Sequence, residues 1–143
     1  MPGITVGVDG SDHSRRALEW AIREAGLRGA PLTVLAVHQV ASNYWTGSAE
    51  HYAADQPATE AVRKAAEDAV QKAVSQVGDP GPASVTVRAV SGLPAHELVG
   101  ASADADLVVV GSRGGGGFAK LVLGSVANKV VSHAACPVVV VHE

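Results

Sequence analysis

The sequence predicts an α/β fold: a single open five-stranded parallel sheet with helices on both faces, in one domain spanning residues 1–143. The first observation is the length, because 143 residues fit the roughly 150 residues of one typical domain. The second is the strict alternation of strand-like and helix-like segments, which is typical of parallel sheets with crossover helices. The third is that the strand-like segments are nearly continuous apolar runs, as expected where helices cover both faces of the sheet.

The first third of the chain predicts a strand, a helix and a second strand. Residues 4–8 form a short apolar run that ends in a turn signal over residues 9–11. A helix is expected from Ser14 onward because apolar residues recur there at helical spacing, and two glycines within residues 26–29 supply its stop. Residues 32–37 form the second apolar run, which predicts the second strand.

The middle of the chain is harder to interpret. Residues 39–57 lack any periodicity and are expected to form a loop, which contains three of the five aromatic residues, Tyr44, Trp45 and Tyr52. Two interpretations of these aromatic side chains stay open, a lid or partner surface and simple packing against the domain. A long amphipathic helix is expected from Thr59, ended by the glycines and prolines of residues 78–82.

The last part of the chain predicts two further strand–helix pairs and a final strand. In residues 85–90 apolar and polar side chains alternate, which predicts a strand with one face more polar than the other. Pro94 is expected to begin a short helix. Residues 107–110 predict a buried strand, residues 124–135 a helix, and residues 138–141 the last strand.

The composition favours a folded chain with no nucleic-acid partner and no membrane span. Hydrophobic residues make up 47% and charged residues 17% of the chain, which is enough apolar surface for a packed core. The formal charge is −3, so the basic excess typical of nucleic-acid binders is missing. Every apolar run is shorter than the roughly 18 residues of a membrane-spanning helix, and no signal peptide is visible. With a single cysteine, a cytoplasmic localisation is expected.

Two loops follow strand carboxyl ends, where doubly wound sheets bind their ligands: residues 9–11 and the glycine-rich residues 111–117. Glycines let backbone N–H groups converge on a phosphate, and the helix expected from Gly124 adds its positive end. The alternative is that these glycines only permit a sharp or mobile loop. No Gly-Lys-Ser/Thr sequence occurs, which excludes the P-loop of the NTPases, and Gly114-x-Gly116-x-x-Ala119 is a weak match to the dinucleotide fingerprint.

The spacing Gly111-x2-Gly114-x9-Gly124-Ser125 resembles the nucleotide motif of the ATP-binding universal stress proteins. Residues 6–11 (VGVDGS) resemble the opening of that family, and residues 133–140 (HAACPVVV) resemble its ending. The resemblance covers the whole domain and implies a Rossmann-like sheet with strand order 3-2-1-4-5. The chain departs from the pattern at Gly10, where some members have proline, and this is expected to loosen the loop after the first strand.

The resemblance also implies which residues contact the nucleotide. Asp9 matches an acidic residue near the adenosine that takes part in metal coordination, here through nucleotide-bound magnesium; the alternative that Asp9 only caps a turn stays open. Val37 matches a position that offers backbone groups to adenine. Arg113 has two open interpretations, a charge on the phosphates and an exposed loop residue without a ligand. The implied nucleotide-binding residues are Gly7, Asp9, Val37, Gly111, Ser112, Arg113, Gly114, Gly115, Gly116, Gly117, Gly124 and Ser125.

The function that the resemblance implies is ATP-dependent sensing or regulation in a stress response. AMP or cyclic AMP would share the adenosine contacts, so the sequence does not separate these ligands from ATP. Two alternatives stay open: slow ATP hydrolysis, for which no catalytic residue is assigned, and an interaction module that binds no nucleotide. The apolar run over residues 138–141 predicts an edge strand and a homodimer formed through it. The scattered histidines predict no structural metal, and Cys136 is expected to be a small buried hydrophobe.

Overall fold

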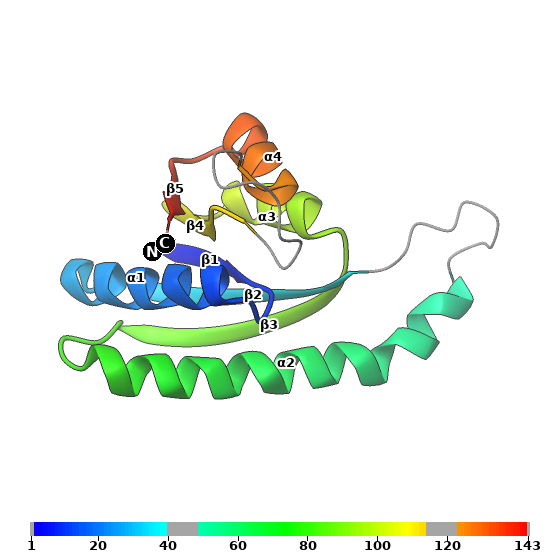
Figure 1. Ribbon diagram of the computed structural model, residues 1–143, viewed down its shortest axis with the longest axis horizontal. Helices are drawn as coiled ribbons and strands as arrows, with labels where there is room; N and C mark the ends of the chain where they lie inside the picture. The colour runs from blue at the N-terminus through cyan, green and yellow to red at the C-terminus, as the bar shows by residue number, and fades with distance from the viewer. Residues whose placement is uncertain (1, 40–48, 114–122, 143) are drawn as a thin grey trace.

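The computed structural model describes the backbone of residues 2–39, 49–113 and 123–142, and the side chains of these ranges except for residues 49–56. The five strands in these ranges are parallel and lie in the order β3-β2-β1-β4-β5, which confirms the predicted topology (Figure 1). The elements are β1 (Ile4–Val8), α1 (Asp12–Arg28), β2 (Pro31–Gln39), α2 (Ala49–Val77), β3 (Ser84–Gly92), α3 (Pro94–Ser102), β4 (Leu107–Gly111), α4 (Ser125–His133) and β5 (Val138–Val141).

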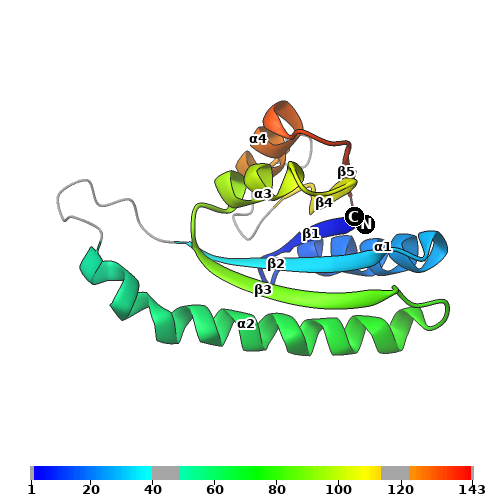
Figure 2. The ribbon, with the colours of Figure 1, turned by 180° about the vertical axis from the view of Figure 1, so that it is seen from behind.

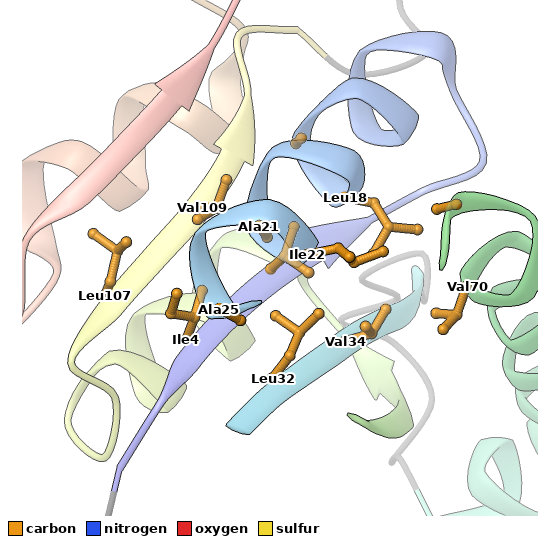
Figure 3. Packing of buried hydrophobic residues seen from close by; sticks show 13 residues of the cluster. Ile4, Leu18, Ala21, Ile22, Ala25, Leu32, Val34, Val70, Leu107 and Val109 are labelled. Carbon is orange, nitrogen blue, oxygen red and sulfur yellow. The ribbon is translucent and has the colours of Figure 1, made fainter. Parts of the chain in front are cut away.

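The helices lie in two layers on opposite faces of the sheet. Figures 1 and 2 show α1 and α2 on one side and the shorter α3 and α4 on the other. The first layer buries a core in which Leu18 and Ile22 of α1 pack against Ile4 and Val34 of the sheet (Figure 3). All four of these side chains are at most 1% exposed, and fully burying an aliphatic side chain contributes roughly 1.5–3 kcal/mol.

A second core lies between the sheet and α3 and α4. Leu98 of α3 and Val130 of α4 pack there with Leu35 and Val108 of the strands. Cys136 packs against this core but is only half-buried, so the prediction that it is a buried residue is wrong. Burial raises the pKa of the Cys136 thiol, which keeps it in the less reactive protonated form at neutral pH.

The predicted loop over residues 39–57 is wrong in its second half, because α2 begins at Ala49 and contains Pro57. Proline lacks the N–H donor of a helix interior, so it interrupts the helical pattern when the sequence is examined alone. Residues 49–56 include three alanines, the residue with the highest helix propensity, and the helix continues through them. Tyr52 therefore lies in α2, whereas Tyr44 and Trp45 lie outside the described residues.

The other predicted elements are confirmed with small shifts at their ends. β2 and β3 are both longer than predicted, because they pair over nine residues from Pro31↔Ser84 to Gln39↔Gly92. α4 ends at His133, two residues before the predicted end, because Ala134 adopts an extended backbone with ψ 148°. None of the helices in the described part of the chain combines the length and apolar character needed to cross a bilayer.

The polar face predicted for the third strand is also present. Thr86 and Arg88 of β3 are exposed, whereas Val87 between them packs against the first core. β3 lies at one edge of the sheet and β5 at the other, so the last strand is an edge strand, as predicted.

Candidate functional site

The carboxyl ends of β1 and β4 form the point where the chain changes sides of the sheet. These two strands are neighbours, paired from Ile4↔Leu107 to Val6↔Val109. The helix that follows β1 packs in the first core, whereas α4, the helix that follows β4, packs in the second. Crossovers that leave adjacent strands in opposite directions open a crevice, which is where doubly wound folds bind ligands.

Asp9 follows β1 directly and its side chain is exposed at this edge. Its Oδ1 accepts hydrogen bonds from the Ser11 amide at 2.9 Å and the Ser11 hydroxyl at 2.5 Å. Asp9 therefore does form the turn-capping contact that the sequence left as an alternative to ligand binding. Gly10 has φ +84°, which proline, with φ fixed near −65°, does not adopt. The turn at Gly10 therefore has a left-handed backbone conformation that excludes proline, and the expected loosening of this loop stays a prediction.

Ser11 closes the N-terminus of α1. Its hydroxyl accepts a hydrogen bond from the Ser14 amide at 3.2 Å, and Asp12 places a carboxylate in the first turn. This cap explains why α1 begins at Asp12 rather than at the predicted Ser14. The cap was not predicted from the sequence, although a serine ahead of the first helical apolar residues is a standard signal for a helix start.

Gly111 ends β4 directly against the first turn of α1. A Cβ at this position would lie 2.9 Å from the carbonyl carbon and oxygen of His13, a distance that real Cβ atoms essentially never show. The absence of a side chain thus allows the backbones of β4 and α1 to meet. Gly111, the first glycine of the motif, therefore has a structural role in bringing the two ends of the crevice together.

Ser112, directly after β4, forms backbone hydrogen bonds to the end of β5 and to the residue before α4. Its amide donates to the Val141 carbonyl at 3.0 Å, and its carbonyl accepts a hydrogen bond from the Gly124 amide at 2.7 Å. Gly124, the last glycine of the motif, is therefore held against Ser112, the residue that follows Gly111. Gly114, Gly115, Gly116 and Gly117 lie outside the described residues, and the half-buried Arg113 directly precedes them.

Within residues 2–39, 49–113 and 123–142, no side chain caps the N-terminus of α4. Gly124 occupies the N-cap position with an extended backbone and no side-chain hydrogen bond, and the first turn contains no acidic residue. Ser125, the first residue of the helix, is exposed. The N-terminus of a helix leaves its first backbone N–H groups without an intrahelical partner and carries a partial positive charge of about half an elementary charge, which favours an anionic ligand.

Val37 lies where β2 extends beyond β1. The pairing of β1 with β2 ends at Val8↔Ala36, whereas the pairing of β2 with β3 continues to Gln39↔Gly92. Among the described residues, the edge of β2 that faces β1 has no strand partner after Ala36. The Val37 side chain packs against the second core, so only its backbone is placed to face a ligand.

Gly7 has a packing role in β1. A Cβ at this position would lie 2.9 Å from a methyl carbon of Leu98, whose side chain is 3% exposed in the second core. The close approach of α3 therefore explains why glycine occupies position 7, and this explanation does not involve a ligand.

Comparison with known proteins identifies the family of the chain. The model of the universal stress protein family matches residues 2–142. The universal stress protein Rv2005c of Mycobacterium tuberculosis is 38% identical over 146 residues, which cover 98% of this chain and 48% of the relative. The chain thus spans about half the length of that relative. YxiE of Bacillus subtilis, also a universal stress protein, is 35% identical, over 96% of this chain and 97% of the relative.

Solved structures agree with this assignment. UspA from Lactobacillus plantarum has a TM-score of 0.77 and 27% identity, over 98% of this chain and 97% of its own. A universal stress protein solved in complex with cAMP has a TM-score of 0.68 and 29% identity, over 99% and 96%. One from Archaeoglobus fulgidus, solved with dAMP, has a TM-score of 0.58 and 26% identity, over 98% and 97%. With its sheet order, its crevice and these relatives, the chain belongs to the universal stress protein family.

Proposed function

We propose that the chain binds an adenine nucleotide, with ATP as the first candidate, in the crevice at the ends of β1 and β4. The observation that carries the proposal is the N-terminus of α4, which no side chain of the described residues caps and which the 2.7 Å hydrogen bond between Gly124 and Ser112 holds against β4. Such a terminus favours phosphate through its free N–H groups and its positive partial charge. The phosphates are assigned to this terminus, and Gly111–Gly117 are further candidate contacts.

The adenosine part of the ligand is assigned to the neighbouring strand ends. Adenine requires hydrogen-bonding groups, and the backbone of Val37 lies where β2 has no partner on its β1 side. Asp9 offers an exposed carboxylate beside it, and carboxylate oxygen is a ligand that magnesium prefers. When bound with the nucleotide, magnesium would offset phosphate charge. The two universal stress proteins solved with cAMP and dAMP support adenine nucleotides as the ligand class.

In the cell, the bound nucleotide would make the protein a nucleotide-dependent sensor or regulator in a stress response. A cytoplasmic localisation and a single working domain over residues 1–143 stay predictions. The match covers only about half of the mycobacterial relative, so this proposal concerns the given chain and not the activity of that longer protein.

The test is thermal unfolding with and without millimolar ATP, AMP, cAMP or NAD, each with and without magnesium. A ligand that binds only the native state stabilises it by about 2.7 kcal/mol when its concentration is 100 times its Kd. We expect the adenine mononucleotides to raise the unfolding midpoint and NAD to leave it unchanged. If no nucleotide raises the midpoint, the interaction-module alternative replaces nucleotide binding.

The motif itself is tested by Gly114→Val. A branched side chain at this glycine would occupy the space through which a phosphate approaches the backbone, so we expect nucleotide stabilisation to be lost. The unfolding midpoint without ligand should stay close to that of the wild type. A folded variant with unchanged nucleotide affinity would contradict the phosphate assignment.

We also propose that two copies of the chain associate through β5. Its four valines are all half-buried at the edge of the sheet, and an apolar edge strand is prone to pair with another chain. Sedimentation equilibrium should show a dimer at micromolar concentration, and Val139→Lys should shift it to monomer. A wild-type mass equal to one chain at every concentration would refute the dimer.

A further inference from the structure

Ser14 joins the end of β1 to the first turn of α1 through one buried hydroxyl. The side chain is 6% exposed, although serine is mostly found at protein surfaces. Its Oγ donates to the Ser11 carbonyl at 3.0 Å and accepts a hydrogen bond from the Asp9 amide at 3.2 Å. The hydroxyl therefore fixes the backbone of Asp9 relative to the helix that follows it.

The same three residues also hold the Asp9 carboxylate. Ser11 Oγ donates to Asp9 Oδ1 and in turn accepts from the Ser14 amide, so Ser14 contacts both the amide of Asp9 and the group that holds its carboxylate. The four hydrogen bonds form one closed network at the edge of the crevice. We propose that Ser14 is a positioning residue for Asp9, which holds its carboxylate where nucleotide-bound magnesium requires it. This inference rests on the proposed function.

A second serine in the fold makes the same contacts far from the crevice and provides a matched control. Ser102, 1% exposed at the end of α3, donates from Oγ to the Val99 carbonyl at 2.5 Å and accepts from the Ala135 amide at 2.8 Å. Like Ser14, it joins a helical carbonyl three residues earlier to the amide of another segment. Ser102 precedes β4 and Ala135 precedes β5, so this pair lies at the amino edge of the sheet, opposite to the crevice.

The experiment compares Ser14→Ala with Ser102→Ala in the full chain. Both variants leave one backbone amide without its hydrogen-bond acceptor, so both should lower the unfolding midpoint. We expect only Ser14→Ala to lower ATP affinity in the presence of magnesium, by about tenfold, which corresponds to ~1.4 kcal/mol. The difference in ATP affinity with and without magnesium should shrink in Ser14→Ala and stay at the wild-type value in Ser102→Ala.

A double-mutant cycle with Asp9→Asn tests whether Ser14 acts through Asp9. Asparagine keeps the oxygen that accepts from Ser11 but loses the charge that attracts magnesium. In the Asp9→Asn background, Ser14→Ala should therefore cause no further loss of ATP affinity. If Ser14→Ala does not fold, Ser14→Cys and Ser102→Cys form the equivalent pair. Cysteine has nearly the same shape as serine, but its thiol forms only weak hydrogen bonds.

The outcomes separate this inference from the proposed function. If wild-type protein binds no ATP, both fail. If it binds ATP but Ser14→Ala and Ser102→Ala change affinity equally, or the losses from Asp9→Asn and Ser14→Ala add, the positioning role of Ser14 is refuted while nucleotide binding stands. A magnesium-dependent loss confined to Ser14→Ala and absent in the Asp9→Asn background supports it.

Discussion

The N-termini of α1 and α4 lie at the same edge of the sheet, on opposite faces, and they are completed in opposite ways. α1 is closed by its own side chains: Ser11 caps it and Asp12 lies in its first turn. α4 follows its N-cap residue Gly124, has no acidic residue in its first turn, and is capped by no side chain among the described residues. Both termini present the same backbone N–H groups and partial charge, so the side chains alone decide which one is left for an external anion.

Under the proposed function, the contrast assigns the two parts of a nucleotide to different sides of the crevice. A terminus that is already satisfied gains little from a phosphate, and its Asp12 would repel one. At the α4 terminus, a bound phosphate would accept hydrogen bonds from the first backbone N–H groups of the helix. The α1 side is thus suited to the adenosine and a cation, through Asp9, and the α4 side to the phosphates.

The largest effect on stability is expected at Gly111, where the end of β4 meets the first turn of α1. Gly111→Ala places a Cβ 2.9 Å from the His13 backbone, so β4 and α1 must move apart. Overpacking of this kind costs typically about 1–3 kcal/mol of unfolding free energy, measured by urea denaturation. Gly100→Ala is the control, because a Cβ there meets nothing within 4 Å and the substitution in a helix should stabilise. Equal effects of the two variants would contradict the close contact at Gly111.

The next largest effect is expected on ATP affinity, when a substitution gives α4 a side-chain cap like that of α1. Gly124→Asp supplies a carboxylate to the free N–H groups, and its charge opposes phosphate, so we expect ATP affinity to fall about tenfold or more, at least ~1.4 kcal/mol. The unfolding free energy without ligand should change by only a few tenths of a kcal/mol. Gly124→Asn is the control that caps without charge and should weaken ATP less. Titration calorimetry that gives equal ATP affinities for wild type and Gly124→Asp would show that α4 is not the phosphate site.

A smaller loss of stability is expected when α1 loses its cap. Ser11→Ala removes the acceptor for the Ser14 amide and one donor to Asp9, and loss of an N-cap costs about 1 kcal/mol. Ser125→Ala at the start of α4 removes no cap and should leave the unfolding free energy within about 0.5 kcal/mol of the wild type. The prediction fails if chemical denaturation finds the two serine variants equally stable.

The smallest effect is expected at an exposed ion pair on α2, which gives the baseline for charge changes outside the crevice. Arg63 binds Glu60 at 2.8 Å, and its hydrogen bonds and charge lower the pKa of the Glu60 carboxyl. A lowered pKa in the folded state means that any stabilisation exists above the usual pKa of glutamate and is lost as the pH falls below it. Because exposed pairs are screened by solvent, Arg63→Ala should leave the unfolding midpoint nearly unchanged at pH 7 and at pH 3. A large midpoint shift at pH 7 would contradict this.

Local patterns predicted most of the elements. β5 has the predicted bounds because four consecutive valines favour a strand regardless of their neighbours. α2 shows where this reasoning stops: Pro57 interrupts the local pattern, but the helix continues on its N-terminal side to Ala49. The turn of Asp9 had two interpretations in the sequence, and the hydrogen bonds to Ser11 establish the capping contact without excluding a ligand at an exposed carboxylate.

The sequence proposed the members of the candidate site, and their binding roles stay predictions. The spacing of the motif singled out Gly111 and Gly124, and the structure joins Gly124 to Ser112, the residue after Gly111. It also gives Gly7 and Gly111 packing roles, against Leu98 and His13, that no local pattern contains. The buried hydroxyl of Ser14 was missed for the same reason, because its significance depends on the strand end that it contacts.

The sequence by itself determined the alternation of strands and helices, the parallel sheet and the family, because each follows from residue periodicity or from the spacing of a motif. Only the tertiary structure decided that Ser11 caps α1 whereas no described side chain caps α4, that β2 extends past β1 beyond Ala36, and that Gly111 meets His13. The physical reason is that these features depend on where separate segments pack and which hydrogen bonds they leave unmade, and such distances are set by the whole fold rather than by neighbouring residues.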